Sequence, residues 1–317
     1  MDNKANFILP GMYEHVELNF RLLKTMQQFP EAFYPEARIG AVYGNFQFCI
    51  YDGGRIFGAE SYSHATKEEM EFIIDTYNKE FNIPVRVIFT NPMLQEKDFH
   101  NRFGQAILKA LNRNDMNEIV VNNEAFENFL RDKYPKLNFI SSTTKCLSTP
   151  AQFKEELDKQ SYKMICLDYN LNKNQKMLQT IPEEIRNQCE FLVNAICPPG
   201  CPNRKEHYRL NGIYSLTYGK PYSTQDCPIT NNTVHPLQRK SHNNLTPEEI
   251  YGQYVPQGFV NFKLEGRTLG IFENLENYVY YMVKPEWQHY IMAYILDEDS
   301  TFKIVNRDKI FIQPHMY

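Results

Sequence analysis

The residues best suited to chemistry in this chain are two cysteines in one short turn. Cys197 and Cys201 flank the residues Pro-Pro-Gly, directly after the apolar run 191–196, and Cys227 follows within reach of the same loop. A Pro/Gly turn can aim both sulfurs at one point, as a metal ion or an iron–sulfur cluster requires. We therefore predict that Cys197, Cys201 and Cys227 are metal ligands. The alternative is a tight turn with two incidental thiols.

Three thiolates need one further ligand, and the sequence does not identify it. Cys49 and Cys146 both follow predicted strand ends, so either can reach the same site. Cys166 lies inside a predicted strand and Cys189 precedes one, so we interpret these two as packed thiols. A 4Fe–4S cluster is the expected cofactor.

Zinc is the alternative cofactor. His207, His235 and His242 are available as zinc ligands, although the chain has no second Cys-x-x-Cys pair of the kind found in small zinc ribbons.

Two charged residues follow the cysteine turn. Arg204 and His207 are three residues apart, so a helix that starts after Pro202 would place them on one face beside the cluster. We expect Arg204 to bind substrate and His207 to act as a catalytic acid or base. The alternative for His207 is a helix-capping or loop-anchoring role.

A second candidate site follows the predicted strand 259–264. Glu265-Gly266-Arg267 places a carboxylate and a guanidinium around a flexible glycine, and arginine suits paired carboxylate or phosphate oxygens. We predict that Glu265 and Arg267 are catalytic, with an internal ion pair as the alternative. Asp168 and Asn91 also end predicted strands and are expected to bind substrate.

Short β-rich runs alternate with helical patterns along most of the chain, which is typical of βα units and a parallel sheet. The helical patterns include an aromatic one from Asn274 to Leu296, whose tyrosines are expected to face the core. The predicted strands are 38–44, 84–90, 118–121, 137–140, 163–167, 190–195 and 259–264, and the other main helices are 67–80, 103–111, 124–133 and 150–159.

Seven strand-like units that each end in polar residues favour a (β/α) barrel of the TIM type, in the α/β class. An open doubly wound sheet is the alternative, but no glycine-rich phosphate loop follows the first predicted strand. We predict one barrel domain over 1–317, with 208–255 as a long loop inserted at the barrel mouth and a short β-like tail over 301–313. The active site should then lie at the carboxyl ends of the strands.

Composition excludes several classes of function. The 317 residues are 42% hydrophobic and carry a formal charge of −4, which argues against a non-specific DNA or RNA coat. No apolar run reaches the roughly 18 residues that a membrane span needs. The N-terminus lacks the pattern of a secretory signal, so we expect a cytoplasmic protein with reduced thiols. The oligomeric state is not predictable from these features.

The cysteine turn, with Arg204, His207 and Cys227, resembles the cysteine region of the collagenase-like peptidases of uncharacterised catalytic type. Asn261-Phe-Lys-Leu-Glu265-Gly-Arg267 is similar to that family's Lys-(Ile/Leu)-Glu-Gly-Arg strand end, which an aromatic helix follows there too. The family resemblance implies a (β/α) barrel. It also implies a cysteine-bound 4Fe–4S cluster at Cys197, Cys201 and Cys227, with Glu265 and Arg267 in the active site. This chain departs from the family in its shorter first cysteine gap and in having no cysteine after Cys227.

Despite the name, better understood members of that family are oxygen-independent hydroxylases that act on RNA or on the ubiquinone ring, several with prephenate as oxygen donor. The resemblance therefore implies an iron–sulfur-dependent hydroxylase of RNA or of a small aromatic substrate. The alternatives are a zinc- or cluster-stabilised barrel that binds a partner without catalysis, and a peptidase-like hydrolase. The last is disfavoured because the chain shows no Ser/His/Asp ordering and no His-Glu-x-x-His helix.

Overall fold

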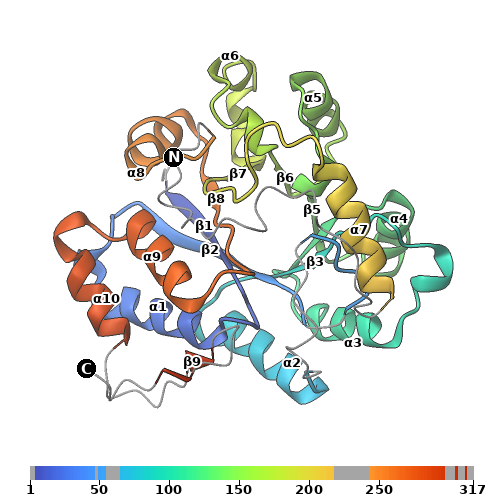
Figure 1. The fold of residues 1–317 in the computed structure, drawn as a ribbon, viewed down its shortest axis with the longest axis horizontal. Coiled ribbons are helices and arrows are strands. Elements are labelled where there is room, and N and C mark those ends of the chain that lie inside the picture. Colours follow the sequence, from blue (N-terminus) through green and yellow to red (C-terminus); the bar gives the residue numbers. More distant parts are fainter. Residues whose placement is uncertain are drawn as a thin grey trace.

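The fold is a closed barrel of eight parallel strands, each followed by helical structure that covers the outside (Figure 1). This computed structural model describes residues 4–46, 49–54, 65–217 and 243–296, and the backbone of 304–305 and 311–312. The barrel strands are β1 (Ala5–Pro10), β2 (Ala37–Gly44), β3 (Val85–Phe89), β4 (Glu118–Val121), β5 (Asn138–Ser141), β6 (Met164–Cys166), β7 (Cys189–Leu192) and β8 (Asn261–Lys263).

Helices surround the barrel on all sides (Figure 1). Several begin with side-chain caps that satisfy their first amide groups; Thr66 and Thr149 form capping boxes at α2 and α5. The helices are α1 (Val16–Gln28), α2 (Lys67–Asp75), α3 (Arg102–Leu111), α4 (Glu124–Lys133), α5 (Pro150–Asp158), α6 (Gln175–Leu178), α7 (Arg204–Leu216), α8 (Pro247–Glu249), α9 (Ile271–Met282) and α10 (Gln288–Leu296).

The predicted barrel is thus confirmed, and the seven predicted strands correspond to β2 through β8. The strand missing from the prediction is β1, which pairs with both β2 and β8 and closes the barrel. Its sequence, Ala-Asn-Phe-Ile-Leu-Pro, is a short and largely apolar run, and such runs lack the alternation that identifies half-buried strands.

Two other predicted segments differ from the structure. The aromatic helix expected over 274–296 is two helices, α9 and α10, because Pro285 interrupts the hydrogen-bond ladder between them. The loop expected over 208–255 is helical at both described ends, in α7 and from Pro247 to Gln257, and residues 218–242 lie outside the described residues. In the tail, β9 (Ile304–Val305) and β10 (Phe311–Ile312) pair antiparallel, which agrees with its β-like prediction.

The barrel interior has two distinct layers. Toward the carboxyl ends of the strands the interior is apolar, and one cluster there contains Ile8, Ile88, Val120 and Ile140. Toward the amino ends of the strands it is ionic. Buried Arg86 there donates to Glu118 at 2.6 Å and forms an ion pair with Glu190.

That ionic layer continues in two directions. Lys163 contacts Glu118 at 2.6 Å, and Lys263 lies 3.8 Å from Glu190. The two buried cations, Arg86 and Lys263, therefore balance the two buried carboxylates, as buried ions require, whereas Lys163 is partly exposed. In the described ranges, every helix is too short or too polar to cross a lipid bilayer.

Candidate functional site

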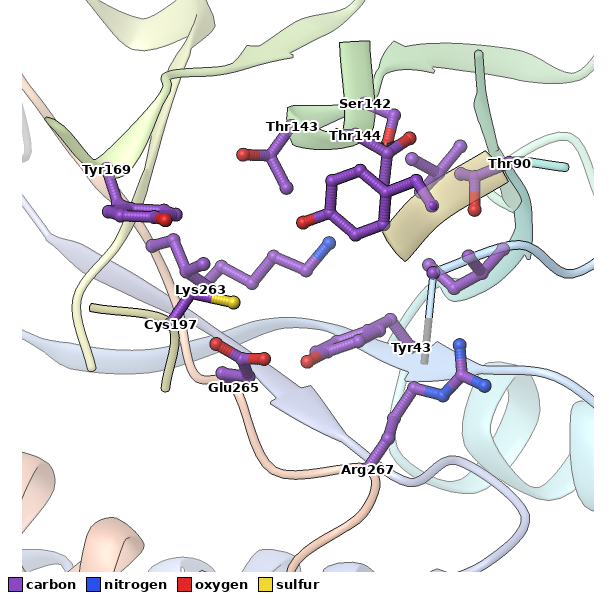
Figure 2. A pocket seen from close by; sticks show the side chains of 15 residues that line it. Tyr43, Thr90, Ser142, Thr143, Thr144, Tyr169, Cys197, Lys263, Glu265 and Arg267 are labelled. Carbon is purple, nitrogen blue, oxygen red and sulfur yellow. Dashed lines mark hydrogen bonds between the residues drawn. The ribbon is translucent and has the colours of Figure 1, made fainter. Parts of the chain in front are cut away.

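A cavity opens at the carboxyl ends of the strands, where barrel enzymes place their active sites. Its walls come from nearly all the strand ends, and three aromatic rings and several aliphatic side chains share them with charged groups (Figure 2). The lining residues are Tyr43, Gly54, Ile88, Thr90, Val120, Ser142, Thr143, Thr144, Tyr169, Leu192, Cys197, Tyr208, Lys263, Glu265 and Arg267.

Three of the lining residues come from β8 and the residues after it. Lys263 and Glu265 are spaced by two, so the alternation of an extended chain turns both toward the cavity. Arg267 lies in the turn that follows and lines the same cavity. Figure 2 shows Lys263 and Glu265 directed into the same space as Tyr43. The Lys263 ammonium lies 4.3 Å from the centre of the Tyr43 ring, a cation–π contact.

Glu265 is held in place from the cysteine side of the cavity. Its carboxylate accepts a hydrogen bond from the Ile196 amide at 2.8 Å, and its own amide donates to the Asn194 side chain at 2.7 Å. These bonds link the segment after β8 to the segment after β7. The half-buried carboxylate therefore has a fixed position next to Cys197, which lines the same cavity.

Arg267 is anchored by acidic residues from two other strand ends. Its guanidinium donates to the Asp52 carboxylate at 2.5 and 3.4 Å, and its Nε lies 4.0 Å from Oε1 of Glu14. Burial opposes the charged form, but Asp52 and then Glu14 keep the pKa of Arg267 above its ordinary value. The arginine is thus a permanent positive charge in the cavity wall. The acidic partner at hydrogen-bond distance is Asp52, whereas the alternative considered from the sequence was an ion pair with Glu265.

Gly266 is required by a close approach of neighbouring side chains. A Cβ at this position would lie 2.0 Å from Oδ1 of Asn274 and 2.8 Å from Cγ of Pro10. Asn274 also donates to the Gly266 carbonyl at 2.9 Å. The glycine therefore lets the first turn of α9 pack directly under the Glu265–Arg267 segment.

The two described cysteines of the predicted metal site differ in exposure. Cys197 is buried and lines the cavity, whereas Cys201 is half-buried in the turn that Gly200 makes with a φ of 65°. Cys227, the third predicted ligand, lies outside the described residues, as do His235 and His242. Within the described ranges, no group of three His, Cys, Asp or Glu side chains is arranged to hold a metal ion.

The other cysteines separate by location. Cys146 follows β5 at the mouth, near enough to Cys197 and Arg204 for their charges to affect its pKa, which burial raises. Burial also raises the pKa of Cys49, Cys166 and Cys189 to about 12. Cys166 and Cys189 are free buried thiols, as expected from their place in the strands.

Arg204 and Asp168, both predicted to bind substrate, form an ion pair with each other. Arg204 is the first residue of α7 and also donates to the backbone and side-chain oxygens of Thr143 at 2.9 and 2.8 Å. Its guanidinium lies 4.3 Å from the centre of the Tyr169 ring. The pair therefore ties α7 to the ends of β5 and β6, and its direct neighbours Thr143 and Tyr169 line the cavity.

Asn91 and His207 stand apart from the cavity wall. Asn91 is fully buried, and its side-chain amide donates to the carbonyls of Ile50 and Gly212 at 2.7 and 3.0 Å. It anchors α7 to the segment after β2, which is a structural role. His207 lies in the first turn of α7, as the spacing from Arg204 predicted, and is half-buried there.

The sequence analysis missed the cavity residues Lys263 and Tyr43 and the anchors Asp52 and Glu14. Lys263 had a usable signal, because it lies two residues before Glu265 on a strand and therefore faces the same side. Glu14 and Asp52 follow strand ends, but nothing in their local sequence indicates that they meet a residue more than 200 positions away.

Comparison of the sequence with protein-family profiles and with curated proteins finds no match. Among solved structures, the chain is similar to the structure of the U32 peptidase Mk0906. The TM-score is 0.50 at 13% sequence identity, and the alignment covers 83% of this chain and 93% of that one. At this identity the similarity concerns the fold alone. It agrees with the closed parallel barrel described above.

Proposed function

We propose that this chain is an enzyme that binds a small anionic aromatic substrate in the cavity at the barrel mouth. One observation carries the proposal: Lys263 and Arg267 are buried cations in the wall of one cavity, together with the Glu265 carboxylate and the Cys197 thiol. Buried cations at a strand-end cavity suit a carboxylate or phosphate group. The tyrosine rings and aliphatic residues beside them suit a flat apolar body.

Each charged residue has a distinct part in this proposal. Arg267, fixed by Asp52, binds the anionic group of the substrate, and Lys263 adds a second positive charge over the Tyr43 ring. Glu265, held by the Ile196 amide, gives or takes a proton at the reacting centre. The ion pair of Arg204 and Asp168 keeps the wall formed by Thr143 in position.

We further propose that Cys197, Cys201 and Cys227 hold a 4Fe–4S cluster, with zinc as the alternative. The described part of the chain contributes two thiols on one Pro/Gly turn, of which Cys197 borders the cavity. A bound cluster would supply one-electron chemistry at this edge of the site. In combination with an anionic aromatic substrate, such a cluster would suit oxygen-independent hydroxylation, with the hydroxyl oxygen supplied by a second organic substrate of the prephenate type that the family resemblance implies. RNA is the less favoured substrate, because the cations are recessed in the barrel mouth.

Anaerobic purification followed by iron, zinc and acid-labile sulfide analysis tests the cluster. We expect about four irons per chain and broad absorbance near 400 nm. Cys197→Ser should lose most of the iron, whereas Cys189→Ser, which changes a buried thiol at the far end of the barrel, should keep it. Stoichiometric zinc without iron would select the zinc alternative. A protein free of both metals would refute a metal site.

Substrate binding is tested separately with benzoate as the simplest aromatic carboxylate. Titration calorimetry should detect binding to the wild type and a loss of binding in Arg267→Met. Binding that is unaffected in Arg267→Met would place the anion elsewhere. If neither benzoate nor any larger aromatic carboxylate binds, the barrel is better described as a partner-binding or structural protein.

A further inference from the structure

Glu14 is a buried carboxyl that the proposed function leaves without a role. It lies in the turn between β1 and α1, and its side chain is 7% exposed. Both of its oxygens lack a hydrogen-bond partner among the described residues. Buried polar atoms in folded proteins nearly always have partners, so an exception calls for an explanation.

The charge balance around Arg267 supplies that explanation. Among the described residues, one guanidinium faces two carboxylates, those of Asp52 and Glu14, and it donates hydrogen bonds to both oxygens of Asp52. With both carboxylates ionised the group carries a net charge of −1. A substrate anion bound to Arg267 would raise this to −2 in a site largely removed from water, where repulsion is poorly screened.

We propose that anion binding at Arg267 is coupled to protonation of Glu14, so that Glu14 is a positioning residue that sets the charge of the substrate site. This inference rests on the proposed function, because it assumes that Arg267 binds the substrate anion. When Glu14 takes up a proton, the Arg267 charge is shared only between Asp52 and the incoming anion. The free carboxyl oxygens of Glu14 leave a place for that proton.

The surroundings of Glu14 support a proton at neutral pH. Burial raises the pKa of Glu14 to about 7; Arg267 and the nearby backbone amides of Glu14 and Tyr13 oppose this rise, and Asp52 adds to it. The other titratable neighbours are uncharged. Burial lowers the pKa of His15 to about 4 and raises the pKa of Tyr77. Arg267 and Asp52 are therefore the charges that face Glu14 in the described part of the chain.

Space around Glu14 is limited by the end of β2. A Cβ on Gly44 would lie 3.1 Å from Oε2 of Glu14 and 3.0 Å from Cγ of Met12. The carboxyl is thus confined between the β2 backbone and Arg267, and its only described cationic neighbour is that arginine. A change of charge at Glu14 therefore changes the electrostatic potential at the Arg267 guanidinium, and with it the affinity of that group for an anion.

The test is the affinity for benzoate between pH 6 and pH 8, where the benzoate carboxylate stays ionised. If only the protonated form binds, a group with a pKa of about 7 weakens binding about tenfold over this range. Glu14→Gln keeps the shape without the charge. The Glu14→Gln variant should bind benzoate with the same affinity at pH 6 and pH 8. At pH 8 it should bind benzoate about tenfold more tightly than the wild type does. Glu31→Gln, which changes an exposed glutamate, should keep the wild-type profile.

A second readout needs no variant. In weakly buffered solution at pH 8, an indicator dye should report uptake of about one proton per benzoate bound to the wild type. A flat affinity profile in the wild type, the same slope in Glu14→Gln, or no proton uptake would each overturn the coupling while leaving the proposed function intact. If benzoate fails to bind at either pH, the proposed anion site fails, and the coupling fails with it.

Discussion

Removal of the Glu14 charge should change how stability depends on pH, even without a ligand. A carboxyl whose pKa rises from 4.5 to about 7 on folding is protonated more readily in the folded state than in the unfolded state. Its stabilising contribution is therefore complete below pH 4.5 and is lost as the pH rises through 7. At 1.36 kcal/mol per pKa unit, this shift corresponds to about 3 kcal/mol.

The assay is urea unfolding of wild type and Glu14→Gln at pH 5, 6, 7 and 8. From pH 5 to pH 8, the free energy of unfolding of the wild type should fall by about 2.5 kcal/mol relative to that of the variant. Other titrating groups cancel in this difference, and Glu31→Gln should show no such trend. A difference that stays constant across the range would refute the raised pKa and the charge balance inferred for Arg267.

Three further substitutions test the site and its supports. Asp168→Asn leaves the Arg204 charge buried without its ion-pair partner, so urea unfolding should show a loss of about 3–5 kcal/mol; a loss under about 1 kcal/mol would mean that the pair is solvated. Arg267→Lys keeps the positive charge but loses the planar guanidinium that binds two oxygens at once, so benzoate should bind at least about tenfold more weakly without a large drop in melting temperature. Benzoate binding at full affinity would show that Arg267 has no recognition role. Gly266→Ala forces its Cβ against Asn274, so stability should fall by about 1–3 kcal/mol, and an unchanged melting temperature would contradict the close approach.

The sequence predicted the regular elements well where local patterns decide them. Strand β4 and helix α4 have the predicted bounds, because a β-branched run and an Asn-capped amphipathic helix carry strong local signals. Strand β1 was missed because its short apolar run has no alternation, although the Pro10-Gly11 pair at its end is a turn signal. A short strand of this kind is defined by its two neighbours in the barrel, which local sequence does not reveal.

For the candidate site, the sequence identified individual residues but not the pairs that they form. Glu265 and Arg267 stood out as charges after a buried strand, and both line the cavity. Asp168 and Arg204 were recognised as polar strand-end and turn residues, but not as each other's partners. The pairing of Arg267 with Asp52 depends on barrel closure, which brings together strand ends that are 215 residues apart in sequence.

Barrel closure also dictates when the site can form during synthesis. Strands β1 and β8 pair directly, and the Asn6 and Asn261 side chains meet across the seam at 3.2 Å. A nascent chain that has not yet released β8 holds Glu14 and Asp52 without the guanidinium that compensates them. Chains emerge from the ribosome N-terminus first, and contacts of such long sequence separation form slowly. The anion site is therefore completed only after nearly the whole barrel has been made, so a partly synthesised chain has no competent cavity.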